Sequence, residues 1–185
     1  KDETLKKLNI LVLGGSQAAK VFAEKLPDIF IKCKKNNINL KIYQQCLSEQ
    51  KIDLQQKYNN NNLSYELFNF TFDIIKYYNL ANLVITRAGS SALAELLNCK
   101  IPFISIPLAS SSENHQLKNA QYFSEKGFGI MLEEKDIDIG LFDLLQSIHK
   151  DKSMLKSIES NQKKHSDKNV FAIIRREITE LFYEN

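Results

Sequence analysis

The sequence predicts an α/β protein of three layers, with a Rossmann-like parallel sheet of about six strands between helices. Along the 185 residues, short apolar runs alternate with stretches of helical spacing, which is the order typical of a parallel sheet. The runs LNILVL and LVIT are continuously apolar, as expected of strands that are buried on both faces. The length suits one domain over residues 1–185.

The elements follow in a regular order. The predicted strands cover residues 8–13, 40–43, 63–68, 83–86, 102–106 and 128–132. The predicted helices cover residues 18–33, 47–58, 72–80, 90–98, 114–126, 136–149 and 152–161, with a last helix at 168–183 in the C-terminal segment 168–185. Pro27 should break or kink the first helix, and Gly127 should end the helix at 114–126.

Composition excludes several classes of protein. A net charge of +3 with scattered Lys and Arg gives no reason to expect nucleic acid as a partner. Cys33, Cys46 and Cys99 lie in apolar contexts without metal-ligand spacing, so we expect reduced core residues and no metal or cofactor. No signal peptide and no membrane-spanning run is evident. The start at Lys1, close to a strand, suggests a cut within a longer protein.

The first strand ends in Gly14-Gly15-Ser16-Gln17. The glycines permit a sharp turn and close approach of a ligand. Ser16 can cap the next helix, whose free N–H groups attract an anion. A plain strand-to-helix turn explains the same residues equally well, because the loop matches neither GxGxxG nor the P-loop.

The loop after the strand at 83–86 repeats this chemistry, with Arg87-Ala88-Gly89 followed by Ser90 and Ser91 at a helix start. In parallel sheets such loops share one edge, and ligands bind near the point where the strand order reverses. Two such helix starts could share a diphosphate, which makes phosphate binding the better interpretation.

Glu95 is the only charged residue between Arg87 and Lys100. A carboxylate in an apolar helix is costly unless it is paired. One interpretation is a structural salt bridge to Arg87 or Lys100. The favoured one is a ribose diol, whose two hydroxyls would donate to the two carboxylate oxygens.

Gln116 and Asn119 share a helix face at spacing i, i+3. Their amides suit sugar hydroxyls, although a polar surface of an amphipathic helix is the simpler explanation for these two residues alone. His115 has no Ser or carboxylate placed to form a triad. No catalytic set is visible, so the chain reads as a binding surface without a catalytic base.

Taken in order, these motifs resemble the C-terminal domain of the MurG family of bacterial N-acetylglucosaminyltransferases. The resemblance runs from about Asn9 to Glu134, and it includes Pro102, Pro107 and the run from His115 to Ala120. It implies the donor-binding half of a two-domain GT-B glycosyltransferase. The N-terminal acceptor domain, with the catalytic histidine, the glycine-rich acceptor loops and an interdomain arginine, would lie outside this chain.

The resemblance also implies roles for individual residues. Gly15 and Ser16 would meet the donor phosphates, the loop around Phe70 and Thr71 would hold uracil through its backbone, and Glu95 would bind the ribose. The remaining contacts to phosphate and sugar would come from Ser90, Ser91, Ala92, Leu93, Ala94, Gln116 and Asn119. Two departures stand out, because Ala18 replaces a family glycine and the loop at 109–112 is rich in serine.

The implied whole protein transfers N-acetylglucosamine from its UDP conjugate to lipid-linked muramyl-pentapeptide, with inversion, at the inner face of the bacterial membrane. This serves cell-wall synthesis, and hence cell shape and division. The chain by itself should bind UDP weakly and not turn over. Alternatives are another UDP-sugar transferase of this fold, such as a glycolipid synthase or a split dolichol-pathway enzyme, or a non-catalytic flavodoxin-like module.

Overall fold

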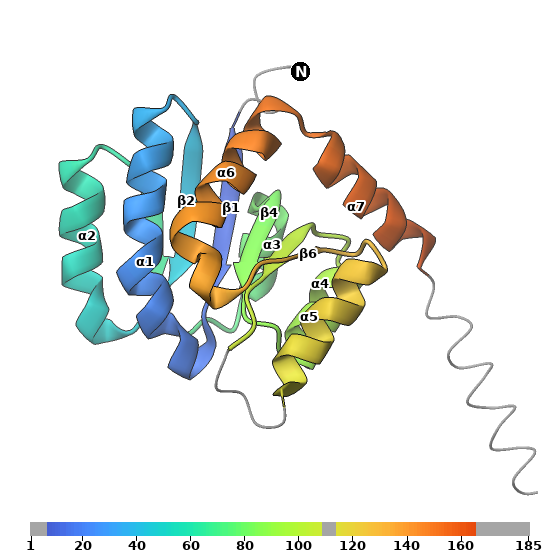
Figure 1. The fold of residues 1–185 in the computed structure, drawn as a ribbon. Helices are drawn as coiled ribbons and strands as arrows, with labels where there is room; N and C mark the ends of the chain where they lie inside the picture. The colour runs from blue at the N-terminus through green and yellow to red at the C-terminus, as the bar shows by residue number, and fades with distance from the viewer. Residues whose placement is uncertain (1–6, 109–113, 166–185) are drawn as a thin grey trace, which may run out of the picture.

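The computed structural model describes residues 7–108 and 114–165, without the side chains of residues 15–19 (Figure 1). The expected helix at 168–183 and the serine-rich loop at 109–112 lie outside the described residues. Within them the chain forms one sheet with helices on both faces, which confirms the predicted three-layer α/β class.

All five strand pairings are parallel, and the sheet order is β3-β2-β1-β4-β5-β6. All six predicted strands are therefore present, with shorter bounds for the last two. The strands are β1 (Leu8–Leu13), β2 (Leu40–Gln45), β3 (Ser64–Phe68), β4 (Leu83–Thr86), β5 (Phe103–Ser105) and β6 (Ile130–Met131).

The helices connect successive strands, and each predicted helix within the described residues is present with small shifts. They are α1 (Gly15–Lys35), α2 (Lys51–Asn60), α3 (Ile74–Leu80), α4 (Ser90–Asn98), α5 (His115–Glu125), α6 (Ile137–Lys150) and α7 (Ser153–Lys164). The short 3-10 turns η1 (Ser48–Gln50) and η3 (Glu134–Asp136) precede α2 and α6. Gly127 has φ +68 just beyond α5, as its predicted role at a helix end requires.

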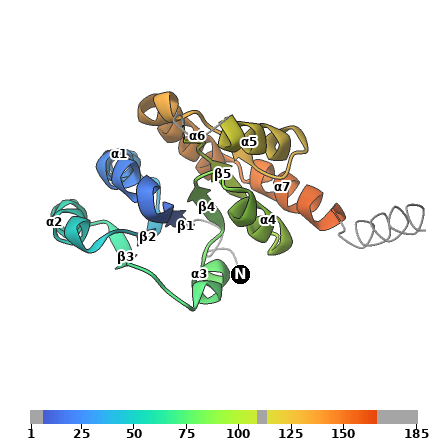
Figure 2. The same cartoon turned by 90° about the horizontal axis from the view of Figure 1, so that it is seen from below.

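Strand residues alternate between two cores, one on each face of the sheet. Ile10 and Val12 of β1 pack into the core under α1, α2 and α6, whereas Leu11 faces the core under α3 and α4. Figure 2 shows α1, α2 and α6 on one side of the strands and α3 and α4 on the other. Burial on both faces explains why the strands are continuously apolar.

Of the predicted break or kink at Pro27, the break is wrong, because α1 extends as one helix from Gly15 to Lys35 with Pro27 inside it. Proline removes one backbone hydrogen bond. The helix buries Phe22 and Leu26 before this position and Ile29 and Phe30 after it, with exposures between 0% and 4%. Tertiary burial on both sides of Pro27 offsets the missing bond.

The cysteines divide into two kinds. Cys33 and Cys46 are buried free thiols, as predicted, and burial raises the pKa of Cys33 to about 12. Cys99 is exposed, so the expectation of a third core cysteine is wrong. Cys99 caps the C-terminal end of α4, where the helix leaves the core, and an apolar sequence context does not reveal this.

A substitution at Gly129, directly before β6, can test how tightly the chain packs against Phe103 there. A Cβ at this position would lie 2.2 Å from Cε2 of Phe103, which is fully buried and cannot move aside. We expect Gly129→Ala to lower the free energy of unfolding by about 1–3 kcal/mol, measured by urea denaturation. Gly89→Ala is the control, because within the described part of the chain its Cβ would meet nothing at 4 Å or less. Equal stability of both variants would contradict this packing.

Candidate functional site

The strand order reverses between β1 and β4, which are neighbours in the sheet although β2 and β3 separate them in sequence. Leu13 pairs with Thr86 at their carboxyl ends. The chain leaves β1 into α1 on one face and β4 into α4 on the other. The two glycine-containing loops therefore lie side by side at the switch point, where open α/β sheets bind ligands.

Helix α4 begins at Ser90, with Gly89 as its N-cap residue. The first intrahelical bond runs from Leu93 N–H to the carbonyl of Gly89, over 3.0 Å. The N–H groups of Ser90, Ser91 and Ala92 precede this bond, so they lack helical acceptors. Together with the helix dipole they make this end of α4 attractive to an anion.

Helix α1 begins in a different way from the one predicted. Gly14 is its N-cap and Gly15 its first residue, so Ser16 lies inside the first turn and does not cap the helix. Ala18 is helical as well. Alanine is the best helix former, so its replacement of a family glycine does not strain the backbone.

Gly89 is not required by the fold. Its φ of −67° and ψ of 135° are open to any residue, and a Cβ there would meet no atom of the described residues within 4 Å, apart from its chain neighbours. A glycine with free space in front of a helix end permits another molecule to approach the backbone closely. This open space lies where the predicted phosphate site is expected.

Arg87 follows β4 directly and is the brace of this edge. Its side chain is buried, and Nη1 lies 2.5 Å from a carboxylate oxygen of Glu134 in η3. Nη1 also donates to the carbonyls of Ile106 and Pro107, over 3.2 and 3.3 Å. The guanidinium lies 4.9 Å from the ring centroid of Phe22. Arg87 thereby connects α1, the loop after β5 and η3.

The sequence did not reveal this brace. The salt-bridge alternative for Glu95 named Arg87 as a partner, but Arg87 pairs with Glu134, which is 47 residues further along the chain. Only the parallel order of β4, β5 and β6 brings these residues together. The one available signal was a lone arginine between a buried strand and a helix start.

Glu95 is exposed on α4, so its carboxylate stays in contact with water. The free-energy cost of burying a charge, on which the sequence argument relied, does not arise. Its neighbour is Tyr78 of α3. The pKa of the Tyr78 hydroxyl is raised by burial first, and then by the charge of Glu95 and a hydrogen bond to it. The carboxylate is therefore oriented from one side by Tyr78 while its other side faces solvent.

Gln116 and Asn119 stand on α5 and tie two loops of the same edge. Oε1 of Gln116 accepts from the N–H of Leu108 at 3.0 Å, and Nδ2 of Asn119 donates to the carbonyl of Ala88 at 3.1 Å. Each amide thus uses one of its two ends to hold the protein. Among the described residues, the amide nitrogen of Gln116 and the side-chain carbonyl oxygen of Asn119 have no hydrogen-bond partner, so both can contact a ligand.

The loop after β3 carries Thr71 at the same edge of the sheet. Its hydroxyl accepts from Asp73 N–H at 3.0 Å, and Asp73 accepts from Lys76 N–H at the start of α3. Phe70 and Phe72 on either side are 71% and 97% exposed, and their rings meet edge to face with centroids 4.9 Å apart. These contacts fix the shape of the loop around Thr71.

The predicted residues therefore fall into groups. Ser90, Ser91 and Ala92 share the first turn of α4, with the exposed Ala94 and Glu95 on the next. Leu93 is fully buried, and its N–H is bonded to Gly89, so its own groups are turned away from a ligand.

The described residues contain no group of three His, Cys, Asp or Glu that could hold a metal. No helix within them is long and apolar enough to cross a membrane.

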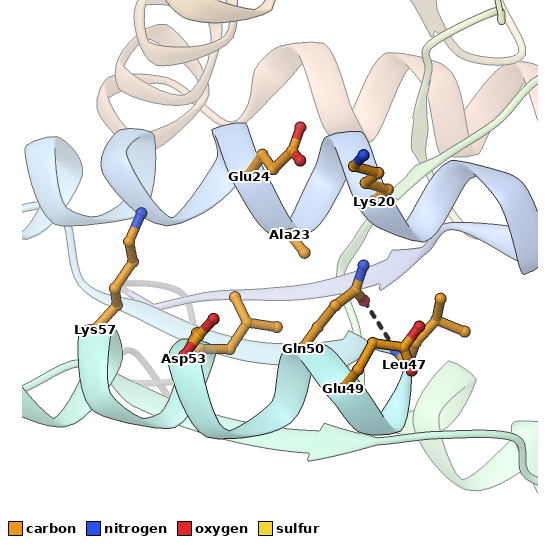
Figure 3. Close-up of a pocket in the computed structure, with 9 residues that line it drawn as sticks. Lys20, Ala23, Glu24, Leu47, Glu49, Gln50, Asp53 and Lys57 are labelled. Atoms are coloured by element: carbon orange, nitrogen blue, oxygen red, sulfur yellow. Dashed lines mark hydrogen bonds between the residues drawn. The ribbon is translucent and has the colours of Figure 1, made fainter.

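Two cavities were compared with the positions of the predicted site residues, and neither is lined by those of them whose side chains the structure describes. The cavity in Figure 3, of about 480 Å³, lies between α1 and the segment from Leu47 to Lys57. Its polar groups are partly engaged, since Gln50 accepts from Leu47 N–H and Lys57 lies 3.7 Å from Asp28. A smaller cavity of about 220 Å³ lies at the switch edge, lined by Pro107, Leu108, Asn114, Leu117, Glu133, Glu134 and Lys135. The smaller one adjoins Gln116 through Leu108, so its position agrees better with the predicted site.

Comparison with known proteins gives one consistent result. The model of the glycosyltransferase family 28 C-terminal domain matches residues 9–175. A Pelagibacter ubique protein, named UDP-N-acetylglucosamine–N-acetylmuramyl-(pentapeptide) pyrophosphoryl-undecaprenol N-acetylglucosamine transferase, is 35% identical over 100% of this chain and 52% of its own length. A Rickettsia typhi protein of the same name is 35% identical over 82% of this chain and 40% of its own.

The crystal structure of Acinetobacter baumannii MurG matches with a TM-score of 0.78 and 25% identity, over 95% of this chain and 54% of that one. The architecture thus matches the C-terminal half of a GT-B glycosyltransferase, as predicted. The chain spans about half the length of the relatives it matches.

The Arg87 brace leads to a stability prediction. Glu134→Gln leaves the buried guanidinium without its counter-charge, so we expect the free energy of unfolding to fall by about 1–3 kcal/mol. Glu133→Gln is the matched control, because Glu133 pairs with Lys135 at 2.8 Å in an exposed position. That change should cost about 0.5 kcal/mol or less. Chemical denaturation of both variants gives the comparison, and equal losses would argue against the brace.

Proposed function

Because the chain belongs to the glycosyltransferase family 28 C-terminal domain family, we propose that it binds UDP-N-acetylglucosamine as the donor-binding half of a transferase. The observation that carries this proposal is the pair of helix starts at the switch point, with open space in front of Gly89. Such a position favours a bound anion on electrostatic grounds. The donor supplies that anion as its diphosphate.

In this proposal the diphosphate meets the first turn of α4, where the N–H groups of Ser90, Ser91 and Ala92 lack helical acceptors. The backbone of Gly15 and Ser16 in the first turn of α1 contributes from the neighbouring strand. Leu93 takes no part through its own groups, since it is buried and bonded to Gly89.

Glu95 would accept hydrogen bonds from the ribose hydroxyls on the side that Tyr78 leaves open. The backbone of the loop around Thr71 would hold the uracil. Gln116 and Asn119 would read the N-acetylglucosamine with the amide ends that the protein does not use. The support for these roles is that all of them lie at the carboxyl edge of one parallel sheet.

The contribution of this half to catalysis would be the stabilisation of the departing UDP. Negative charge grows on the diphosphate as the glycosidic bond breaks, and fixed N–H dipoles at a helix start stabilise it without reorganisation. The catalytic base and the acceptor site belong to the rest of the protein in this proposal. The isolated chain should therefore bind UDP weakly and not turn over.

For the whole protein we propose transfer of N-acetylglucosamine to undecaprenyl-diphospho-muramyl-pentapeptide in peptidoglycan synthesis. The acceptor is lipid-linked, so the protein would work as a peripheral protein at the inner face of the bacterial membrane. The support is the name of relatives that are 35% identical to this chain over the matched residues. The partner would be the N-terminal domain, which corresponds to the half of those relatives that this chain does not cover.

The role of Glu95 can be tested with a pair of ligands. We expect UDP to bind the wild-type chain about tenfold more tightly than 2′-deoxy-UDP, because the deoxy analogue lacks one hydroxyl that the carboxylate would accept from. In Glu95→Ala, UDP affinity should fall by about tenfold and the preference over 2′-deoxy-UDP should disappear. Isothermal titration calorimetry measures all four affinities.

Glu125→Ala serves as the control for this cycle, because Glu125 is an exposed glutamate at the other end of α5. It should bind both nucleotides like the wild type. The same measurable UDP affinity in wild type and Glu95→Ala would refute the ribose contact.

Gly89 provides a second test that separates binding from folding. A Cβ at this position has free space in the protein but would stand where the proposed diphosphate approaches the backbone. We expect Gly89→Ala to keep or slightly raise the thermal stability while weakening UDP binding by about tenfold or more. Thermal shift with and without UDP reports both quantities. Unchanged UDP affinity would place the diphosphate elsewhere.

A further inference from the structure

A pocket of about 320 Å³ lies at the opposite edge of the sheet from the proposed donor site. It is formed by the turns that lead into β4 and β5 and by the first two turns of α7. The apolar part of its lining comes from Ala81, Ile101, Pro102 and Leu155. The proposed donor site uses the carboxyl ends of the strands, whereas this pocket lies at their amino ends.

The charged groups around this pocket are mostly cationic. Lys100, Lys152 and Lys156 line it together with a single carboxylate, Glu159. Glu159 is already paired with Lys163 one helical turn further on. Within the part of the chain that the structure describes, none of the three lining lysines lies within 4.0 Å of a carboxylate oxygen.

Asp151 is the other acid close to this group, since the charge of Lys156 contributes to the lowering of its pKa. The larger causes of that lowering are hydrogen bonds from Ser153, whose N–H lies 2.8 Å and whose hydroxyl lies 2.7 Å from the carboxylate. Asp151 therefore keeps its negative charge at the start of α7 and offsets only part of the positive charge that the three lysines bring to the pocket. An excess of positive charge remains around it.

The positions of these lysines do not stabilise the fold by any contact described above. Lys152 and Lys156 are like charges at spacing i, i+4, which repel each other on a helix. Lys100 and Lys152 are half-buried, and burial lowers the pKa of Lys152. Lys100 also occupies the left-handed region with φ 58°, a position that favours Gly or Asn. Surface lysines that only add solubility would not need these positions.

The walls of the pocket are held in place by buried contacts. Nε2 of Gln162 in α7 donates to the carbonyls of Ile101 and Phe128, over 3.0 and 2.7 Å. On the sheet side, Asn82 accepts from Asn9 N–H at 3.0 Å and donates to the carbonyl of Lys7 at 3.2 Å. The lysines therefore project from fixed backbone, which lowers the entropic cost of binding a ligand.

We propose that this pocket binds the phosphate group of a small phosphate ester. Lysine ammonium groups bind phosphate as point charges, and partial burial strengthens the attraction relative to open solvent. The volume is at the low end of ligand pockets, which suits a compact ligand. The ester is either a soluble metabolite or a phospholipid headgroup, and the two sources are separated by the choice of probe.

The test uses the whole 185-residue chain at low ionic strength. Glycerol 3-phosphate is the soluble probe, followed by calorimetry, and vesicles of phosphatidylglycerol are the lipid probe, followed by co-sedimentation. The triple variant Lys100→Gln/Lys152→Gln/Lys156→Gln removes the pocket charges. We expect it to weaken binding by about tenfold or more, and we expect binding of the wild type to weaken with added salt.

Lys34→Gln/Lys35→Gln/Lys164→Gln is the matched control, because it removes the same charge from exposed lysines outside the pocket. It should bind each probe within about twofold of the wild type. Saturable binding of glycerol 3-phosphate that only the pocket variant loses supports a soluble ester. Binding confined to vesicles, again lost only in the pocket variant, supports a headgroup. Equal loss in both variants, or no saturable binding of either probe, overturns the proposal.

Folding is controlled separately. Thermal denaturation and UDP titration of each variant show whether the fold and the opposite edge are intact. Lys156→Gln alone changes a single exposed side chain, so it keeps the test decisive if the triple variant does not fold. It should lower the affinity for the probe by about threefold while leaving UDP binding unchanged.

Discussion

The pairing of β1 with β4 is the contact on which the other features of this domain depend. Leu13 and Thr86 are neighbours at the carboxyl ends of these strands although 72 residues separate them in sequence. Because the chain leaves the two strands toward opposite faces, α1 and α4 start next to each other without competing for space. One backbone register therefore sets both the layer structure and the position of two anion-attracting helix ends.

The contacts of Arg87 hold the segments at the carboxyl edge of the sheet in fixed positions. A buried guanidinium is costly unless it is paired and hydrogen-bonded, and here it finds a carboxylate in η3, two carbonyls after β5 and the ring of Phe22. Each of these partners belongs to a segment that borders the switch point. The amides of Gln116 and Asn119 add two further ties to the loops after β5 and β4. The polar groups of this edge thus position loops as well as offering contacts to a ligand.

The two edges of the sheet have different chemistry. The carboxyl edge carries the N–H groups at the start of α4, and the described residues leave free space beside Gly89. At the amino edge, lysines on fixed backbone line a pocket, and the one carboxylate that the described residues contribute to this lining is already paired. A diphosphate and a phosphate monoester or diester would be held by different means at the two places, by backbone dipoles at one and by point charges at the other.

Local sequence patterns were sufficient to predict the helices and strands and their order. Continuous apolar runs and helical periodicity are local properties. The six strands and the α-helices of the described residues could therefore be predicted from the sequence. The candidate edge also followed, because parallel strands place the loops after them together. The sequence could not show that α1 tolerates Pro27, because the burial of Phe22, Leu26, Ile29 and Phe30 that holds the helix is a tertiary effect.

Which side chains meet depends on how the elements pack against one another. The Arg87–Glu134 pair and the Tyr78–Glu95 contact join residues from separate elements, and no local pattern encodes such distances. Exposure was likewise undecided, since Glu95 within α4 and Cys99 at its C-terminal end stand in an apolar stretch of sequence yet face solvent. The lysine-lined pocket likewise depends on tertiary structure, because α7 must pack against the turns before β4 and β5 for Lys100, Lys152 and Lys156 to line one cavity.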